Sequence, residues 1–308
     1  MNLKEQSYIV AVANCGSFTK AAEELHISQP ALSSFVGRLE ALLGVKLFNR
    51  HAKELEPTYA GELYISAARE MLSAKDEFDA ILSDLRLDQG GRLRIGMQTR
   101  RSPYVIPLFY REFSRLYPKV ELSFAEGVID ELETMLNNNE LDFIICNQIH
   151  AAKNYEYIKI ADERLLFAVS KTHRLAPLAV DKYRHGLKWI DLRHFDGETF
   201  ILQRPGQSQR AASDALMKSM NVRPGRVIEI SNIETSNRMA ALGAGVSFAL
   251  ETYVRHFNFQ PSPAYFLTGV EAPALALVAA HKKGSYMPCF IAPAIEIIRR
   301  NLCPAHDR

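Results

Sequence analysis

Apolar positions near the start of the chain repeat with the period of two short helices. The two apolar stripes are Phe18, Ala21, Ala22 and Leu25, then Leu32, Val36, Leu39 and Leu43 with 4-3-4 spacing. Ser17 and Ser28 each precede a stripe and carry the short oxygen-bearing side chain that caps helices, while Pro30 fits a first turn, where no N–H is needed. The pattern predicts a helix from Ser17 to about Leu25, a sharp turn and a second helix from about Gln29.

The outer face of the second helix is small and polar. It carries Pro30, Ser33, Ser34, Gly37 and Arg38, opposite the apolar stripe. A plain helical hairpin and a DNA-reading helix-turn-helix share this spacing, so residue identity has to decide between them.

The next segments predict a small wing and then a long helix. Gly44 is a good helix stop, and strands are expected at 45–48 and 55–57 around a turn. Thr58 caps a helix predicted to reach about Leu87. Its apolar seam, at alternating spacings of four and three, consists of Ala60, Tyr64, Ala67, Met71, Ala74, Phe78, Ile81 and Leu85. A seam of about four heptads between charged outer positions predicts a coiled coil. The alternative is that this seam packs on the chain's own C-terminal part.

Beyond Gly90-Gly91 the pattern changes to alternating strands and helices. Strands are expected at 92–98, 120–127, 141–147, 163–173, 199–206, 226–231, 246–251 and 273–283. Helices are expected at 102–118, 128–140, 208–220, 233–245 and 289–302. This alternation predicts an α/β fold with a parallel sheet covered on both faces.

Specific residues now identify the N-terminal pattern. The motifs are AAxxLxxSQPALS from Ala21, LExxLGxxLFxR from Leu39 and PTxAG from Pro57. Together they resemble the N-terminal domain of LysR-type transcriptional regulators over roughly 60 residues without a gap. The segments LDFIICN, LLFAVSKTHRLA and IETSNRMAALGAGVSFAL resemble, more loosely, the effector domains of that family. Two positions depart from it: Phe35 replaces a usual Gln, and Ser34 stands where a basic side chain is frequent.

The resemblance implies a winged helix-turn-helix followed by a two-lobed, doubly wound α/β effector domain of the solute-binding-protein type. The expected boundaries are 1–57 for the DNA-binding domain, 58–89 for the dimerisation helix and 90–308 for the effector domain, with lobe I at 92–161 and 267–303 and lobe II at 162–266. The expected partners are double-stranded DNA with an interrupted inverted repeat, a small-molecule effector, further copies in a homodimer or homotetramer, and RNA polymerase if the protein activates transcription. A cytoplasmic carboxylate-binding protein without DNA function is the alternative.

The resemblance and the patterns together nominate residues for each role. For DNA contact they are Ser28, Gln29, Pro30, Ser33, Ser34, Arg38, Arg50 and Lys53. For dimerisation they are Tyr64, Met71, Phe78, Ile81 and Leu85.

Effector candidates come from the ends of strands, because ligands of open α/β sheets bind beyond the carboxyl ends of strands, near helix N-termini. They are Thr99, Arg100, Ser102, Gln148, Gln203, Arg204, Asn232 and Thr235. Arginine beside polar donors at these junctions indicates an anionic effector, such as a small carboxylate. Helix capping would equally explain Ser102, Ser208 and Thr235, and solvated surface charge would explain Arg100 and Arg101.

Composition narrows the remaining classes. A net charge of +2 over 308 residues gives no overall sign of nucleic-acid binding, so the DNA argument depends on local charge around the second helix. No apolar run has the length of a membrane span or the form of a signal peptide, so a cytoplasmic location is expected, without membrane contact. Neither the four scattered cysteines nor the nine histidines show metal-ligand spacing, and the Gly-x-Ser-x-Gly and P-loop motifs are absent. We therefore expect no enzyme activity, no metal and no cofactor.

Overall fold

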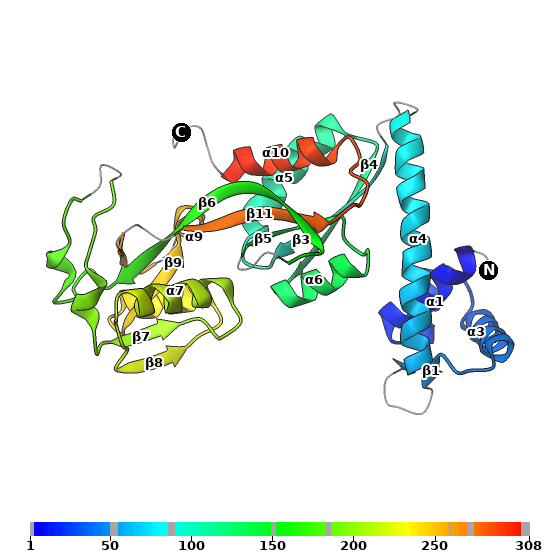
Figure 1. Cartoon of the computed structure of the whole chain (residues 1–308), viewed down its shortest axis with the longest axis horizontal. Coiled ribbons are helices and arrows are strands. Elements are labelled where there is room, and N and C mark those ends of the chain that lie inside the picture. Colours follow the sequence, from blue (N-terminus) through cyan, green and yellow to red (C-terminus); the bar gives the residue numbers. More distant parts are fainter. Residues whose placement is uncertain are drawn as a thin grey trace.

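The computed structural model describes residues 3–49, 55–85, 90–148, 152–182, 186–258, 260–269 and 274–302. The long helix α4 (Tyr59–Leu85) stands at one end of the molecule with the N-terminal helices gathered around it (Figure 1). The α/β part extends away from α4 as two lobes joined by long strands.

The N-terminal part is a helix-turn-helix with a small wing. It consists of α1 (Leu3–Cys15), α2 (Phe18–Glu24), α3 (Gln29–Leu43), β1 (Phe48–Asn49) and β2 (Glu56–Pro57). Both predicted caps are confirmed, since the side chains of Ser17 and Ser28 accept hydrogen bonds from the backbone N–H groups three residues on. Gly44 ends α3 with φ +72°, a left-handed conformation that suits glycine. The first wing strand begins at Phe48, three residues later than predicted.

Thr58 and Gly61 fix the start of α4 against the wing. The Thr58 hydroxyl accepts a hydrogen bond from the Gly61 N–H at 3.0 Å, which confirms the predicted cap, and donates one to the Lys46 carbonyl at 2.6 Å. A Cβ at Gly61 would lie 2.0 Å from the Leu47 carbonyl oxygen, so only glycine permits this approach.

Lobe I is built on a mixed sheet. Its strands are β3 (Gly91–Gln98), β4 (Val120–Gly127), β5 (Phe143–Asn147), the first half of β6 (Tyr155–Val169) and β11 (Ala274–Lys282). Its helices are α5 (Ser102–Leu116), α6 (Ile129–Asn137) and α10 (Ile291–Leu302). Side chains of α5 and α10 share one apolar cluster with the sheet, while those of α6 share another, so the helices cover both faces.

Lobe II continues the same sheet beyond β6. Its strands are β7 (Thr199–Leu202), β8 (Arg226–Glu229), β9 (Val246–Leu250) and β10 (Ala264–Phe266), with helices α7 (Ser208–Ser219), α8 (Ile233–Ala241) and α9 (Glu251–His256). Two short 3-10 helices, Ala176–Leu178 and Leu192–Phe195, precede β7. A separate apolar cluster fills this lobe.

The expectation of a parallel sheet is wrong for the strands that join the lobes. The described strands run in the order β4-β3-β5-β11-β6-β9-β7-β8, with β10 paired to β6. Within each lobe the βαβ units are parallel, but β6 and β11 cross between the lobes and pair antiparallel with each other, β11 with β5, and β6 with β9 and β10. The chain therefore passes to lobe II along β6 and returns along β11, with a β-bulge between Leu277 and Val278 where they cross.

Candidate DNA and effector sites

The polar face of α3 is exposed while its apolar stripe is buried. Leu32 and Val36 are fully covered by the other N-terminal helices and the wing. On the outer face Ser28, Gln29, Pro30, Ser34 and Arg38 are exposed and Ser33 is half-buried. Arg50 and Lys53 lie outside the described residues.

Phe35, beside the apolar stripe of α3, packs against the N-terminal apolar cluster. Its ring meets Tyr8 edge to face, with ring centres 5.4 Å apart. Ser34, the second departure from the family pattern, is exposed. An aromatic side chain turned toward α1 leaves the neighbouring small polar residues to form the outer face.

Glu40 is a buried carboxylate that the sequence reading missed. Only 2% of the residue is exposed, and its carboxylate accepts hydrogen bonds from the backbone N–H groups of Leu47 (2.9 Å) and Phe48 (3.3 Å) and from Lys46 Nζ (3.0 Å). Burial alone raises the pKa of Glu40, but these hydrogen bonds and the Lys46 charge outweigh it and hold the pKa below its usual value. The position of Glu40, four residues after Val36 on the apolar side of the helix, is the sequence feature that indicates its burial.

A cavity of about 320 Å³ lies between the lobes, at the carboxyl ends of β3, β4 and β7. It is lined by residues 98–100, 127–130 and 204–209 and by Ser231, Ile233, Leu250 and Tyr253. Ligands of open α/β sheets bind at this edge, so the cavity is the candidate effector site.

Three of the eight effector candidates line this cavity. They are Thr99 and Arg100 from lobe I and Arg204 from lobe II. Gln203 is fully buried behind the cavity wall, where its side-chain amide donates to Ser236 Oγ at 3.2 Å and its oxygen accepts from Gln209 at 2.8 Å. Gln148, Asn232 and Thr235 are not among the lining residues.

Capping explains fewer of the hydroxyls than expected. Ser102 is buried and donates to the Thr99 carbonyl oxygen at 2.9 Å, so it braces the turn and does not cap α5. Asn232, and not Thr235, caps α8, because its side-chain oxygen accepts the Thr235 N–H at 3.1 Å. Ser208 is the first residue of α7, after an N-cap (Gln207) that makes no side-chain capping bond.

The two neighbouring arginines have different surroundings. Arg100 is half-buried in the cavity wall, and burial lowers the pKa of its guanidinium. Among the described residues no carboxylate pairs with Arg100 or with Arg204. Arg101 is fully buried against Glu163, so the reading of this residue as a solvated surface charge is wrong.

Comparison with known proteins covers both parts of the chain. The model of the bacterial regulatory helix-turn-helix protein, lysR family, matches residues 3–62, and the model of the LysR substrate binding domain matches residues 87–303. The chain belongs to the LysR family of transcriptional regulators. The alternative of a binding protein without DNA function is set aside by the helix-turn-helix match.

The relatives of this LysR regulator are themselves transcriptional regulators. It is 30% identical to the HTH-type regulator CbbR of Rhodospirillum rubrum, over 80% of this chain and 78% of the relative. It is 29% identical to CfxR of Cupriavidus necator, over 80% of this chain and 75% of the relative. Like them it is a DNA-binding regulator with an effector-binding domain.

Solved structures share the fold over the whole length. A full-length OxyR variant from Pseudomonas aeruginosa superimposes with a TM-score of 0.74 at 24% identity, covering 98% of this chain and 94% of that one. Full-length CbnR in complex with its target DNA gives 0.64 at 23% identity, covering 98% of this chain and all of that one.

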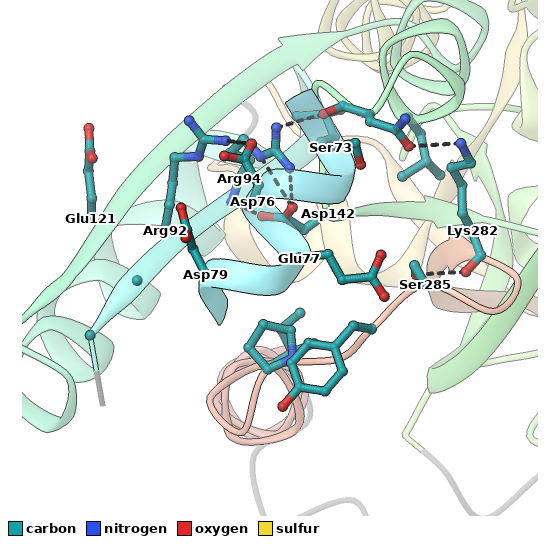
Figure 2. Close-up of a pocket in the computed structure, with 18 residues that line it drawn as sticks. Ser73, Asp76, Glu77, Asp79, Arg92, Arg94, Glu121, Asp142, Lys282 and Ser285 are labelled. Carbon is teal, nitrogen blue, oxygen red and sulfur yellow. Dashed lines mark hydrogen bonds and ion pairs between the residues drawn. The ribbon is translucent and has the colours of Figure 1, made fainter. Parts of the chain in front are cut away.

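A second cavity of the LysR regulator, of about 450 Å³, lies between α4 and the amino ends of β3 and β4 (Figure 2). Its walls are strongly charged. Arg94 binds Asp142 through its side chain and its backbone N–H, Arg92 pairs with Asp76 of α4, and Lys282 donates to Asn139 Oδ1 at 2.8 Å. Lobe I therefore contacts α4 through polar side chains around a cavity, and no sequence pattern indicated this contact.

Among the described residues no helix is long and apolar enough to cross a membrane. The same residues contain no group of three or more His, Cys, Asp and Glu side chains that could hold a metal ion.

Proposed function

We propose that the outer face of α3 reads base edges through Ser28, Gln29, Pro30, Ser33 and Ser34, while Arg38, Arg50 and Lys53 contact phosphates. This proposal is supported by the burial of α3: its apolar residues Leu32 and Val36 are fully buried, while its polar face is exposed. Small side chains allow close approach to a groove, and Gln29 offers both a donor and an acceptor to base edges.

Two copies of the chain bring two such helices to one operator. On α4 the seam residues Met71 and Phe78 are 38% and 57% exposed, so both keep apolar surface in contact with water in the single chain. Tyr64 and Ile81 are half-buried, and the side chain of Leu85 lies outside the described set. A second α4 packed on this face removes apolar surface from water. The resulting two-fold dimer, alone or paired into a tetramer, reads an interrupted inverted repeat whose half-sites lie a whole number of helical turns apart.

The effector occupies the cavity between the lobes and is an anion. Arg100 and Arg204 line this cavity from opposite lobes, and among the described residues neither pairs with a carboxylate, although Asp130 also lines the cavity. The N-terminus of α7, whose N-cap makes no side-chain bond, faces the same space and adds free N–H groups and a partial positive charge. An anion held from both lobes stabilises their closed arrangement, and this differential affinity couples ligand binding to DNA binding.

We assign residues 1–57 to DNA binding, 58–89 to dimerisation and 90–308 to effector binding. If the regulator activates transcription, it also contacts RNA polymerase. The family matches at 3–62 and 87–303 and the separate apolar clusters support these domain boundaries.

Thermal unfolding of the full chain in sodium succinate or sodium phosphate, against sodium chloride at equal ionic strength, tests the effector site. Wild type should be stabilised by one of the two anions beyond the chloride control, because a ligand held only by the native state raises its stability. Arg100→Met should lose that stabilisation, and Arg226→Met, on exposed β8 away from the cavity, should keep it. Equal stabilisation of the Arg100→Met variant and wild type contradicts the assignment.

A further inference from the structure

Arg100 and Arg101 are neighbours in sequence whose side chains enter different sites. Arg100 lines the inter-lobe cavity, while Arg101 has no exposed surface and meets Glu163 of β6 through two contacts, at 2.7 and 2.9 Å. We propose that Arg101 is the positioning residue of the effector site: it fixes the turn that presents Thr99 and Arg100, and it ties that turn to both lobes. The ligand part of this inference rests on the anionic effector proposed above.

The turn between β3 and α5 has few anchors of its own. The Arg101 N–H donates to the Gln98 carbonyl at 2.8 Å, and the Thr99 N–H reaches the Gly127 carbonyl at 3.3 Å. Two local side-chain bonds brace it, from Ser102 Oγ to the Thr99 carbonyl and from Arg101 Nη1 to Tyr104 Oη at 3.3 Å. A guanidinium fixed in a two-contact geometry at the end of this turn restricts the backbone of the residue before it.

Arg101 belongs to a cluster of polar side chains from separate parts of the fold, and it also donates to Tyr104 Oη of α5 at 3.3 Å. Glu163 lies on the crossing strand β6, Asn147 ends β5 in lobe I, and Thr252 lies on α9 in lobe II. Arg101 donates to Asn147 Oδ1 at 3.2 Å, and the side chains of Asn147 and Thr252 both donate to the Glu163 carboxylate. Glu163, Asn147 and Thr252 are at most 7% exposed, so the charges of Arg101 and Glu163 are compensated within the protein and not by water.

Tyr253 connects this cluster to the cavity. The Cζ atom of Arg101 lies 5.4 Å from the centre of the Tyr253 ring. Tyr253 is also one of the residues that line the inter-lobe cavity. A ligand that contacts Arg100 and Tyr253 thus touches both neighbours of Arg101, and any shift of α9 relative to lobe I has to rearrange the ion-pair cluster.

Hydrogen–deuterium exchange of the full-length protein tests the positioning role without a ligand. Arg101→Lys keeps the charge but loses the planar two-contact geometry, and Glu163→Gln keeps the shape but loses the charge. In both variants the Thr99 and Arg101 amides should exchange at least tenfold faster than in wild type. Arg94→Lys is the matched control, because it alters another paired arginine, on β3 itself, and should leave these two amides unchanged.

Unchanged protection of both amides in Glu163→Gln overturns the positioning role, even if Arg101→Lys does not fold. Repeating the succinate and phosphate measurement separates this inference from the proposed function. Loss of the anion effect in Arg101→Lys as well as in Arg100→Met supports both. An anion effect that survives in Arg100→Met contradicts the proposed cavity site, whereas faster exchange of the turn still supports the role of Arg101.

Discussion

Arg69 on α4 and Glu140 in lobe I form an ion pair whose atoms Nη2 and Oε1 lie 2.9 Å apart. The same guanidinium donates to Asn14 Oδ1 of α1 at 2.6 Å. One side chain therefore touches the DNA-binding part and the effector part at once, beside the cavity that separates α4 from lobe I.

A double-mutant cycle with Arg69→Ala and Glu140→Ala should give a coupling free energy of about 0.5–1 kcal/mol. That is the upper part of the range for exposed pairs, because 19% and 26% of the two side chains remain exposed. Arg69→Ala alone should cost more than Glu140→Ala, since it also removes the 2.6 Å bond to Asn14, whereas Glu140→Ala also removes only a longer bond from Asn138, at 3.4 Å. Urea unfolding of wild type, the two single variants and the double variant measures the cycle. Strictly additive effects would show that the ion pair does not stabilise the contact between α4 and lobe I.

The wing should loosen in acid through Glu40. Its pKa in the folded protein lies below the unfolded value of about 4.3, so its stabilising contribution is complete above that value and is lost as pH falls through the folded pKa. Glu40→Gln should cost about 1.5–3 kcal/mol at pH 7, the range for hydrogen bonds to a charged group. The difference in the free energy of unfolding between Glu40→Gln and wild type should become smaller below about pH 4.5.

Urea unfolding at several pH values measures this difference. Glu62→Gln, on the exposed face of α4, is the control and should change little at any pH. A deficit of Glu40→Gln that stays constant down to pH 3.5 would contradict the role of the Glu40 charge.

The N-terminal fold could be predicted because its signals are local. Ser28, Pro30 and Gly44 mark the ends of α3, and the spacing of its apolar residues fixes which face is buried. Thr58 marks the start of α4 in the same way. Each of these signals acts within one or two turns of helix, so the chain around it is enough to interpret it.

Side chains whose surroundings come from distant segments could not be assigned. Arg100 and Arg101 stand in the same local sequence, and only Glu163, 62 residues further on, decides which of them is buried. The first half of β6 carries the apolar–polar alternation of a half-buried strand but was not predicted, and it pairs with β11, more than 100 residues later. Thr99, Arg100 and Arg204 could be nominated because strand ends are recognisable, whereas Tyr253 also follows a predicted strand (246–251) but was not nominated.

Removal of one partner of the buried pair Arg101 and Glu163 should destabilise the effector domain strongly. Glu163→Leu leaves a buried guanidinium without its counter-charge and should cost about 3–5 kcal/mol. Glu251→Leu breaks a similar two-contact pair with Arg164, in which 27% of the arginine side chain stays exposed, and should cost clearly less. Thermal unfolding of the two variants measures the difference, and equal losses would mean that burial does not set the cost.

Dimerisation should depend on the exposed face of α4. Phe78→Asp places a charge in the proposed contact between two helices and should shift the protein toward monomer at micromolar concentration. Phe78→Leu keeps an apolar side chain and is the matched control. Light scattering over a dilution series gives the masses, and an unchanged oligomer in Phe78→Asp would remove this face from the interface.

Loss of a phosphate contact should weaken binding to every DNA sequence. For Arg38→Ala the slope of log affinity against log salt should fall by about one unit, since one fewer counterion is released. Lys53→Ala should behave in the same way, and Arg226→Ala in lobe II is the control. Fluorescence anisotropy from 50 to 300 mM salt measures the slopes, and a wild-type slope in Arg38→Ala would place this residue away from the phosphates.

Two α3 helices should read an interrupted inverted repeat, and sequencing of duplexes that the full-length protein selects from a random library tests this directly. The enriched duplexes should contain two inverted half-sites separated by a fixed number of base pairs that places both on one face of the helix. The Gln29→Ala variant should tolerate changes at particular base pairs within each half-site, because it loses one base-edge contact. Enrichment of single sites without symmetry, or identical preferences for Gln29→Ala and wild type, would contradict the proposed reading of DNA.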